Sequence, residues 1–388
     1  MMFQRHATAT RPEMPLRASG SIACSPDGAL KADEVSRFAV RLVVIDSATP
    51  HVTPFARLPE LLRAGDLVVV NDAATLPAAL PGLTANGLAF ELRLSAPVDG
   101  SRIHGVLLGA GDHHTRTEHR ATPPAIAIGD HVQIGSIEAI VASKFGRRVV
   151  LMTSLEGDAL WQALYACGRP VQYAHRDALL PLYAVQTAYA ARPWAVEMPS
   201  AGRALTWEVL LGLRRAGITL ATLTHAAGLS STGDDALDRA LPWPERYEIP
   251  QRTLDLIAPT QAAGGRVIAV GTTVVRALES AAADLRSGPQ GGPSAVRSRA
   301  SAQTPTRDRS YPASGSGIAT LRLDGAYRPK IVDGLISGLH VPGESHFDLL
   351  SAFAPAERLR AAVELASAQG LSGHELGDAC LILSSTSS

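Results

Sequence analysis

The feature that most restricts the fold is a short apolar segment, Arg266–Val270 (RVIAV), that runs directly into Gly-Thr-Thr and then into a helical pattern. Such a run is typical of a buried strand, and Thr273–Arg286 has the spacing of a helix. The order is reversed where a helical segment, Thr206–Arg215, with Thr206 as its N-cap, precedes the strand-like Ile218–Thr224. Helices and strands that alternate in this way predict an α/β domain.

The same reasoning predicts further elements. Strands are expected at Arg37–Asp46 and Leu67–Val70, and helices at Leu155–Cys167, Pro250–Ala263 and Pro355–Gln369. Pro259, inside the second of these helices, should kink it or make it restart.

The block from Gly82 to Thr153 has a different pattern. Short runs such as LAFELRL, HVQIGSIEAIVA and RVVLMT alternate apolar and polar residues, with turn signals between them. This pattern is typical of a small antiparallel barrel or sandwich. We therefore expect residues 81–154 to form a small antiparallel β-barrel domain inserted into an α/β domain made of residues 1–80 and 155–388. Residues 287–317, rich in Ser, Pro, Gly and Arg, are expected to be a mobile loop of that domain.

Composition excludes several functional classes. Lys and Arg total 36, as do Asp and Glu, so the net charge gives no support to a broadly basic nucleic-acid surface, although a local patch remains compatible with it. Three widely spaced cysteines without a CxxC pair predict no zinc site, no disulfide frame and a reducing compartment, the cytoplasm. No apolar stretch reaches the length of about 18 residues that spans a membrane. We expect a monomer that binds neither metal nor membrane.

Small and polar residues interrupt the apolar segments where ligands commonly bind. The turn Gly271–Thr273 offers backbone N–H groups and hydroxyls that could hold a carboxylate, a phosphate or a ribose, although a simple helix cap is equally expected. Asn71 and Asp72 end the strand LVVV, at a strand end where α/β folds bind ligands; an Asx turn is the alternative. Ser200 and Gly202 could admit a ligand close to the backbone or form an ordinary turn.

Acid–base candidates come from the last quarter of the chain. His340 and Glu344 stand four residues apart in an irregular link, with Ser345 next to them, and could form an acid–base pair. A structural histidine is about as common. Asp378 precedes the apolar run ACLIL, where it is either a second catalytic carboxylate or a turn residue.

These separate segments occur together, in this order, in one known family. The chain resembles the S-adenosylmethionine:tRNA ribosyltransferase-isomerases of queuosine biosynthesis from about residue 37 to 383, apart from residues 287–317. The matching segments are AGDLVVVND to LPAAL (Ala64–Leu80), VQTAYA (Val185–Ala190), MPSAG (Met198–Gly202), GRVIAVGTTVVRALES (Gly265–Ser280), VDGLISGLHVPGESHFDLLSAF (Val332–Phe353) and GDACLIL (Gly377–Leu383). The resemblance implies a larger α/β barrel-like domain with a small β-barrel inserted.

The resemblance also implies a reaction. The ribosyl group of S-adenosylmethionine moves to the aminomethyl group of 7-aminomethyl-7-deazaguanine in tRNA and isomerises to epoxyqueuosine, while adenine and methionine leave. S-Adenosylmethionine is then a substrate, tRNA is a partner and no metal is needed. The implied catalytic residues are His340, Asp378 and Glu344. The implied substrate-binding residues are Gly271, Thr272, Thr273, Arg276, Asn71, Asp72, Ser200, Gly202 and Ser345.

The chain also differs from the family pattern. Ala74 and Ala79 stand where the family has arginines, Ala204 replaces a histidine, and His225 lies one position from the family's histidine. Three functions therefore remain open: the family reaction on tRNA, a diverged ribosyl transfer to another acceptor, and a catalytically silent nucleoside-binding protein. The retained Gly271–Thr273, His340 and Asp378 favour an active enzyme.

Overall fold

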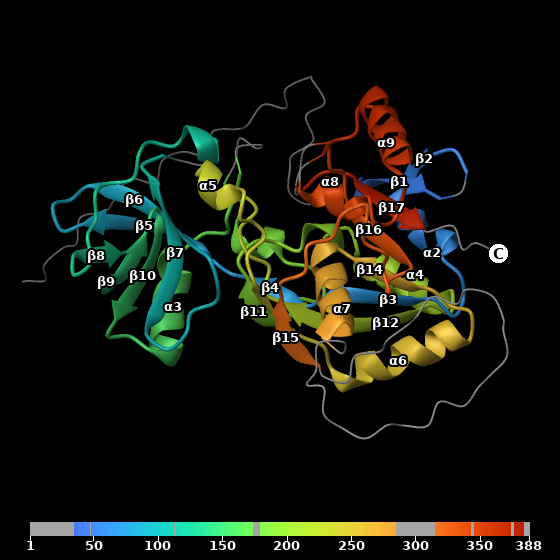
Figure 1. Cartoon of the computed structure of the whole chain (residues 1–388), viewed down its shortest axis with the longest axis horizontal. Helices are drawn as coiled ribbons and strands as arrows, with labels where there is room; N and C mark the ends of the chain where they lie inside the picture. The colour runs from blue at the N-terminus through green and yellow to red at the C-terminus, as the bar shows by residue number, and fades with distance from the viewer. Residues whose placement is uncertain are drawn as a thin grey trace, which may run out of the picture.

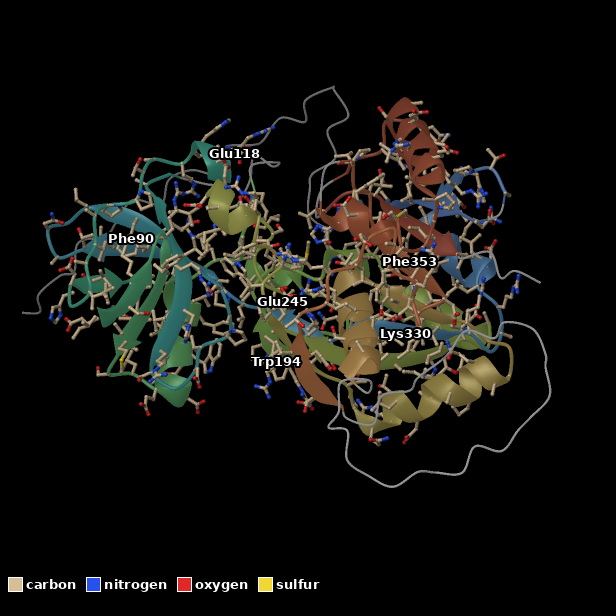
Figure 2. The ribbon with its side chains drawn as sticks, viewed as in Figure 1. Phe90, Glu118, Trp194, Glu245, Lys330 and Phe353 are labelled. Atoms are coloured by element: carbon tan, nitrogen blue, oxygen red, sulfur yellow. The ribbon has the colours of Figure 1, made fainter. Side chains whose placement is uncertain are left out.

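The protein consists of a large mixed sheet with helices on both faces and a closed antiparallel barrel (Figure 1). The computed structural model describes residues 35–46, 48–111, 114–173, 179–284, 315–342, 345–373 and 376–383. Each part has its own apolar core, as Phe90 in the barrel and Phe353 in the larger part illustrate (Figure 2).

Four neighbouring parallel strands form the centre of the large sheet. They are, in order, β12 (Thr219–His225), β3 (Leu67–Asn71), β14 (Val267–Val270) and β16 (Gly334–Gly338). Every residue of β3 and β14 is buried, because helices cover both faces of the sheet. The expected strand at Arg266–Val270 is therefore confirmed.

The sheet extends on both sides by antiparallel pairing. Beyond β16 lie β17 (Ala379–Leu383), β1 (Arg41–Ile45) and β2 (His51–Pro54); β17 is antiparallel to β16 but parallel to β1. Beyond β12 lie β13 (Glu245–Glu248) and β15 (Ser316–Ala319). The nine described strands thus end at two edges, β15 and β2.

Side chains alternate along each strand between two helical layers. Val69 points into the core formed with α6 (Gln251–Ala262), α7 (Thr272–Asp284) and α9 (Ala356–Ala368). Val70 points to the opposite face, which is covered by α2 (Leu58–Leu61) and α4 (Trp207–Arg215). Residues two apart on a strand share a face, so this alternation fixes which helices cover which side.

The predicted helix boundaries are close to the observed ones. Helix α4 (Trp207–Arg215) begins after Thr206, whose side chain accepts a hydrogen bond from Val209 N–H, and Gly217 follows with φ 74°. The predicted restart at Pro259 is wrong, because α6 continues through it. Pro259 lies on the exposed face, where water can satisfy the carbonyl group that proline leaves without a donor.

The barrel consists of six antiparallel strands in the order β10-β7-β6-β5-β8-β9. Their bounds are β5 (Ala79–Thr84), β6 (Ala89–Leu94), β7 (Arg102–Gly109), β8 (His131–Ile134), β9 (Ile137–Phe145) and β10 (Arg148–Thr153). Helix α3 (Gly157–Cys167) packs Leu160 and Leu164 against the barrel core. The predicted α/β fold with an inserted antiparallel barrel is confirmed, whereas the division into domains at residues 80 and 154 stays a prediction.

The remaining elements are short. They are α1 (Val35–Phe38), η1 (Phe55–Arg57), α2 (Leu58–Leu61), β4 (Ala73–Thr75), η2 (Thr117–His119), η3 (Leu182–Val185), β11 (Arg192–Ala195), η4 (Ser200–Gly202), α5 (Asp235–Asp238) and α8 (Ser345–Leu350). The mobile loop expected at 287–317 lies mostly outside the described residues, but its last two residues belong to β15 and pair with β13. Among the described helices, none has the length and apolar character needed to cross a membrane.

Candidate functional site

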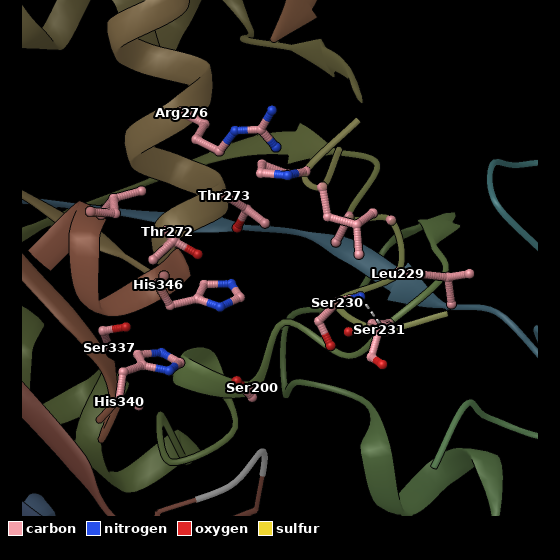
Figure 3. A pocket seen from close by; sticks show the side chains of 18 of the residues that line it. Ser200, Leu229, Ser230, Ser231, Thr272, Thr273, Arg276, Ser337, His340 and His346 are labelled. Atoms are coloured by element: carbon pink, nitrogen blue, oxygen red, sulfur yellow. Dashed lines mark hydrogen bonds between the residues drawn. The ribbon is translucent and has the colours of Figure 1, made fainter. Parts of the chain in front are cut away.

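A cavity of about 680 Å³ opens at the carboxyl ends of the parallel strands (Figure 3). Its lining includes the segments that follow three of them: Gly271–Thr273 after β14, Leu339 and His340 after β16, and Ala227–Ser231 after β12. This edge of the sheet is where α/β folds commonly bind ligands, and the volume lies in the range of small-molecule sites.

The Gly271–Thr273 turn forms one wall of the cavity. Gly271 has φ 91°, a left-handed conformation that favours glycine, and its N–H donates to Ile336 O at 2.8 Å. Within the described residues, the backbone N–H groups of Thr272 and Thr273 have no acceptor. They lie at the positive end of α7, so this wall is suited to an anionic group such as a carboxylate.

Two histidines lie beside that turn. The rings of His340 and His346 are stacked, with centroids 4.7 Å apart and planes inclined by 14°, and both line the cavity with Ser337 (Figure 3). The structure therefore places His340 in the same cavity as the Gly271–Thr273 turn, while its catalytic role stays a prediction. His346 was not predicted; its only signal in the sequence is its place at the start of the helix that follows the His340 segment.

The facing wall contains a hydrogen-bonded group that sequence reasoning missed. Glu197 Oε1 accepts hydrogen bonds from Ser230 N–H at 2.7 Å and from the Tyr173 hydroxyl. The Tyr173 oxygen in turn accepts from Ser231 N–H and from the Ser230 hydroxyl, both at 3.2 Å. Burial raises the pKa of Glu197, and burial together with the charge of Glu197 raises that of Tyr173.

Arg276 was expected to bind the substrate, but the structure gives it partners within the protein. It forms a buried ion pair with Glu245, the first residue of β13 in the large sheet (Figure 2). Its other donors reach three backbone carbonyl groups, those of Trp243, Ala319 and Leu321. Four of its five N–H groups are thus used, and it joins α7 to β13 and to the end of β15.

His225 lies behind Glu245, away from the cavity. It is fully buried, with Nε2 3.5 Å from Glu245 Oε2, and burial lowers its pKa to about 3, so it is neutral at pH 7. Burial raises the pKa of Glu245, against the opposing effects of Arg276 and of the Gly228 N–H, which donates to Glu245 Oε1 at 2.6 Å. Glu245 is therefore held in place from several sides.

Asn71 and Asp72 do not line the cavity. The buried Asn71 exchanges hydrogen bonds with the backbone of His225, at 3.0 and 2.9 Å, and its Nδ2 lies 3.5 Å from Thr273 Oγ1. Asp72 accepts from the Thr224 hydroxyl at 2.6 Å. Both residues therefore connect β3 to β12 beneath the site.

Asp378 also lies away from the large cavity. Its Oδ1 accepts from Arg41 N–H at 2.7 Å, and its Oδ2 accepts from the Arg41 guanidinium and Ser372 N–H, both at 2.9 Å. It borders a separate space of about 10 Å³, of which Ser200 and Gly338 are also neighbours. The structure thus places Asp378 behind the wall that contains Ser200, where it fixes the start of β17.

The other predicted residues have different positions. Ser200 lines the large cavity, but Gly202 is buried against Tyr189, whose hydroxyl would clash with any Cβ at that position. Gly202 therefore makes room for a tyrosine. Glu344 lies outside the described residues; Ser345 begins α8, and its side chain lies outside them too.

Charges around the cavity are mainly negative. The lining carboxylates belong to Glu118, Glu197, Glu245, Asp324 and Asp348, and the lining guanidiniums to Arg116, Arg276 and Arg322. Two of these cations are paired with lining carboxylates, Arg276 with Glu245 and Arg116 with Glu118 at 3.6 Å. The excess of carboxylates favours a cationic ligand. Among the described side chains, no group of three or more His, Cys, Asp and Glu is arranged to hold a metal ion.

Comparison with known proteins identifies the family of this chain. Residues 23–382 match the model of a family described as queuosine biosynthesis protein. The chain is 33% identical over 339 residues to the S-adenosylmethionine:tRNA ribosyltransferase-isomerase of Synechococcus elongatus, covering 85% of each protein. It is 32% identical over 356 residues to the protein of the same name from Gloeobacter violaceus, covering 88% of this chain and 89% of that one.

A crystal structure of S-adenosylmethionine tRNA ribosyltransferase from Thermotoga maritima is also similar, at 20% identity and a TM-score of 0.44 over 89% of this chain and 93% of that one. The family match spans nearly the whole chain, and both curated relatives exceed 30% identity over most of their length. The chain belongs to the queuosine biosynthesis protein family.

Proposed function

We propose that this protein is an S-adenosylmethionine:tRNA ribosyltransferase-isomerase, which transfers the ribosyl group of S-adenosylmethionine to the aminomethyl group of 7-aminomethyl-7-deazaguanine in tRNA. The names of its relatives support this proposal. The observation that carries it is the position of His340, a proton-transfer group, in the same cavity as the N–H groups of Thr272 and Thr273. The acidic lining suits the sulfonium of the substrate.

The reaction requires different contributions from the histidine and from the backbone N–H groups. The sulfonium acidifies the adjacent 5′ carbon, so that a base can remove a proton there, and adenine leaves more easily when its ring is protonated. We assign the base to His340, whose ring is oriented by the stacked ring of His346. The N–H groups at the start of α7 would hold the methionine carboxylate. Glu344 stays a candidate acid. Asp378 is assigned a structural role, which is to support the cavity wall that contains Ser200.

Release of products tests the proposal. The protein is incubated with S-adenosylmethionine, with and without tRNA that carries the aminomethyl-deazaguanine, and free adenine and methionine are measured. We expect release only with the modified tRNA. The acidic lining also suits a small amine as acceptor, so release with such an amine and not with tRNA would support a diverged transferase. Binding of S-adenosylmethionine without any release would contradict an enzymatic function.

Replacement of His340 tests its role as base. In His340→Ala we expect turnover to fall by about 10²–10⁴-fold, the usual contribution of a well-placed proton-transfer group, with little change in S-adenosylmethionine binding. His131→Ala, at an exposed position on β8, serves as the control. Unchanged turnover in His340→Ala would show that another group removes the proton.

A further inference from the structure

The wall opposite the Gly271–Thr273 turn presents a hydrogen-bond acceptor to the cavity. Ser230 and Ser231 stand on this wall (Figure 3). Glu197, in the segment that follows β11, also lines the cavity and is joined to them by hydrogen bonds. Its Oε1 is occupied by the Tyr173 hydroxyl and by Ser230 N–H. The hydrogen bonds that the described residues donate to Glu197 end at Oε1, and Glu197 is only partly buried and lines the cavity.

The hydrogen bonds around Glu197 run in one direction. Ser231 N–H and the Ser230 hydroxyl donate to the Tyr173 oxygen, and Tyr173 then donates to Glu197. Arg93, from β6 of the barrel, lies over the Tyr173 ring at 5.2 Å and adds a positive charge behind it. Because Tyr173 and Ser230 N–H both donate hydrogen bonds to the carboxyl group, that group acts as a hydrogen-bond acceptor. A ligand at Oε2 must therefore supply N–H groups or a positive charge.

The residues beside Glu197 suit the flat faces of a heterocycle. Leu229, Leu241 and Pro242 also line the cavity, and the two leucines are buried. Apolar side chains of this kind can pack against a planar ring while one polar group forms hydrogen bonds with the edge of that ring. The wall therefore combines an apolar surface with a single charged acceptor.

We propose that Glu197, oriented by Tyr173, is the specificity residue of a subsite for the acceptor heterocycle, and that it accepts hydrogen bonds from a ring N–H group and the neighbouring exocyclic amino group. This inference rests on the proposed function, because that function requires two heterocycles in one cavity. The pairing edge of a deazaguanine carries two neighbouring N–H donors, which match a carboxylate. The corresponding edge of adenine places a ring-nitrogen acceptor beside its amino group, and that acceptor would face the carboxylate unfavourably.

With this subsite, the two reactants would bind at opposite walls of the cavity. S-Adenosylmethionine would bind at Thr272 and Thr273, and the acceptor would enter from the barrel side, where Tyr173 and Arg93 lie. A base in tRNA has to leave its stack to reach such a wall, as in other enzymes that act on nucleobases. The amine would then meet the ribosyl group in the space between the two walls.

The test uses Glu197→Gln, because the amide keeps the shape of the carboxylate. Its oxygen can still accept from Ser230 and Tyr173, so its NH₂ group takes the place of Oε2 and presents donors to the N–H donors of the heterocycle. Calorimetry would measure the binding of 7-deazaguanine, which lacks the reactive amine, and separately of S-adenosylmethionine. We expect the affinity for 7-deazaguanine to fall about 10–100-fold, as for loss of a hydrogen bond to a charged group, with S-adenosylmethionine affinity unchanged.

Two further variants complete the design. Tyr173→Phe removes the hydroxyl that orients Glu197 and should lower 7-deazaguanine affinity by a smaller factor, which provides a second test if Glu197→Gln does not fold. Glu138→Gln, on the exposed face of β9, is the matched control and should bind both ligands normally.

The outcomes separate this inference from the proposed function. Absence of 7-deazaguanine binding to the unaltered protein, an unchanged affinity in Glu197→Gln, or a selective loss of S-adenosylmethionine binding would each overturn the subsite. If 7-deazaguanine binds through Glu197 but modified tRNA elicits no adenine release, the proposed function fails and the subsite stands. If adenine is released and Glu197→Gln has the normal KM for modified tRNA, the function stands and the subsite fails.

Discussion

Replacing Arg276 by methionine should destabilise the protein, because the substitution leaves a buried carboxylate without its counter-charge. Arg276 and Glu245 have side-chain exposures of only 6% and 10%, and Arg276 also donates to three backbone carbonyl groups. The ion pair joins α7 to the first residue of β13. Loss of the guanidinium should therefore weaken the packing of α7 against this edge of the sheet.

The magnitude follows from the burial of the pair. Removing one partner of a buried ion pair typically costs about 3–5 kcal/mol. With an unfolding entropy of about 2.1 cal/mol/K per residue, a chain of 388 residues has a total of about 0.8 kcal/mol/K, so the melting temperature should fall by about 4–6 °C. Glu245→Leu combined with Arg276→Met should recover part of this loss, because the double variant contains no unpaired charge.

Thermal unfolding followed by tryptophan fluorescence measures the effect, with Arg252→Met on the exposed face of α6 as the control. Binding of S-adenosylmethionine to each variant is measured in parallel. If Arg276→Met melts at the normal temperature but no longer binds S-adenosylmethionine, the guanidinium serves the ligand and the argument from its internal partners is refuted.

Two further substitutions test the supports of the sheet. Burial alone would raise the pKa of Asp66, but hydrogen bonds from Arg266 and from neighbouring backbone N–H groups outweigh it and lower that pKa. The stability that Asp66 provides is thus present at neutral pH and is lost as the pH falls through the lowered pKa. The difference in urea midpoint between the unaltered protein and Asp66→Asn should therefore become smaller below about pH 4. A difference that is constant from neutral pH to pH 3 would contradict this. Glu279→Ala should cost about 3 kcal/mol or more in urea unfolding, because Glu279 accepts hydrogen bonds from the three N–H groups of Lys330–Val332; a cost equal to that of the exposed Glu364→Ala would disprove it.

The sequence predicted the fold well where the signal is local. Apolar runs and their period of two or about 3.6 residues depend on neighbours within one segment, which is why β14, α4 and the barrel strands were found. The antiparallel insertion of β17 between β16 and β1 was not predicted, because strand order depends on contacts between distant segments. A run such as ACLIL indicates burial but not the direction of its neighbours.

The site was harder to predict because a residue type does not reveal its partners. Arg276 and Asp378 have the chemistry of binding and catalytic groups, yet their partners Glu245 and Arg41 lie 31 and 337 residues away along the chain. The sequence indicated Glu197 only weakly as a site residue, through its position two residues before Pro199 and the turn that follows. Only the folded chain shows that it faces the cavity.

The asymmetry of the cavity restricts how its ligands can be arranged. The N-terminus of α7 presents N–H donors and a partial positive charge at Thr272 and Thr273, so it attracts a carboxylate and repels a sulfonium. The carboxylates of Asp324 and Asp348 also line the cavity and have the opposite preference. Under the proposed function, S-adenosylmethionine must therefore bind with its amino-acid carboxylate at α7 and its sulfonium turned toward the acidic lining. That orientation leaves the ribosyl carbons facing the open cavity, where the acceptor amine is expected, so the charges of the cavity favour a productive approach of the two substrates.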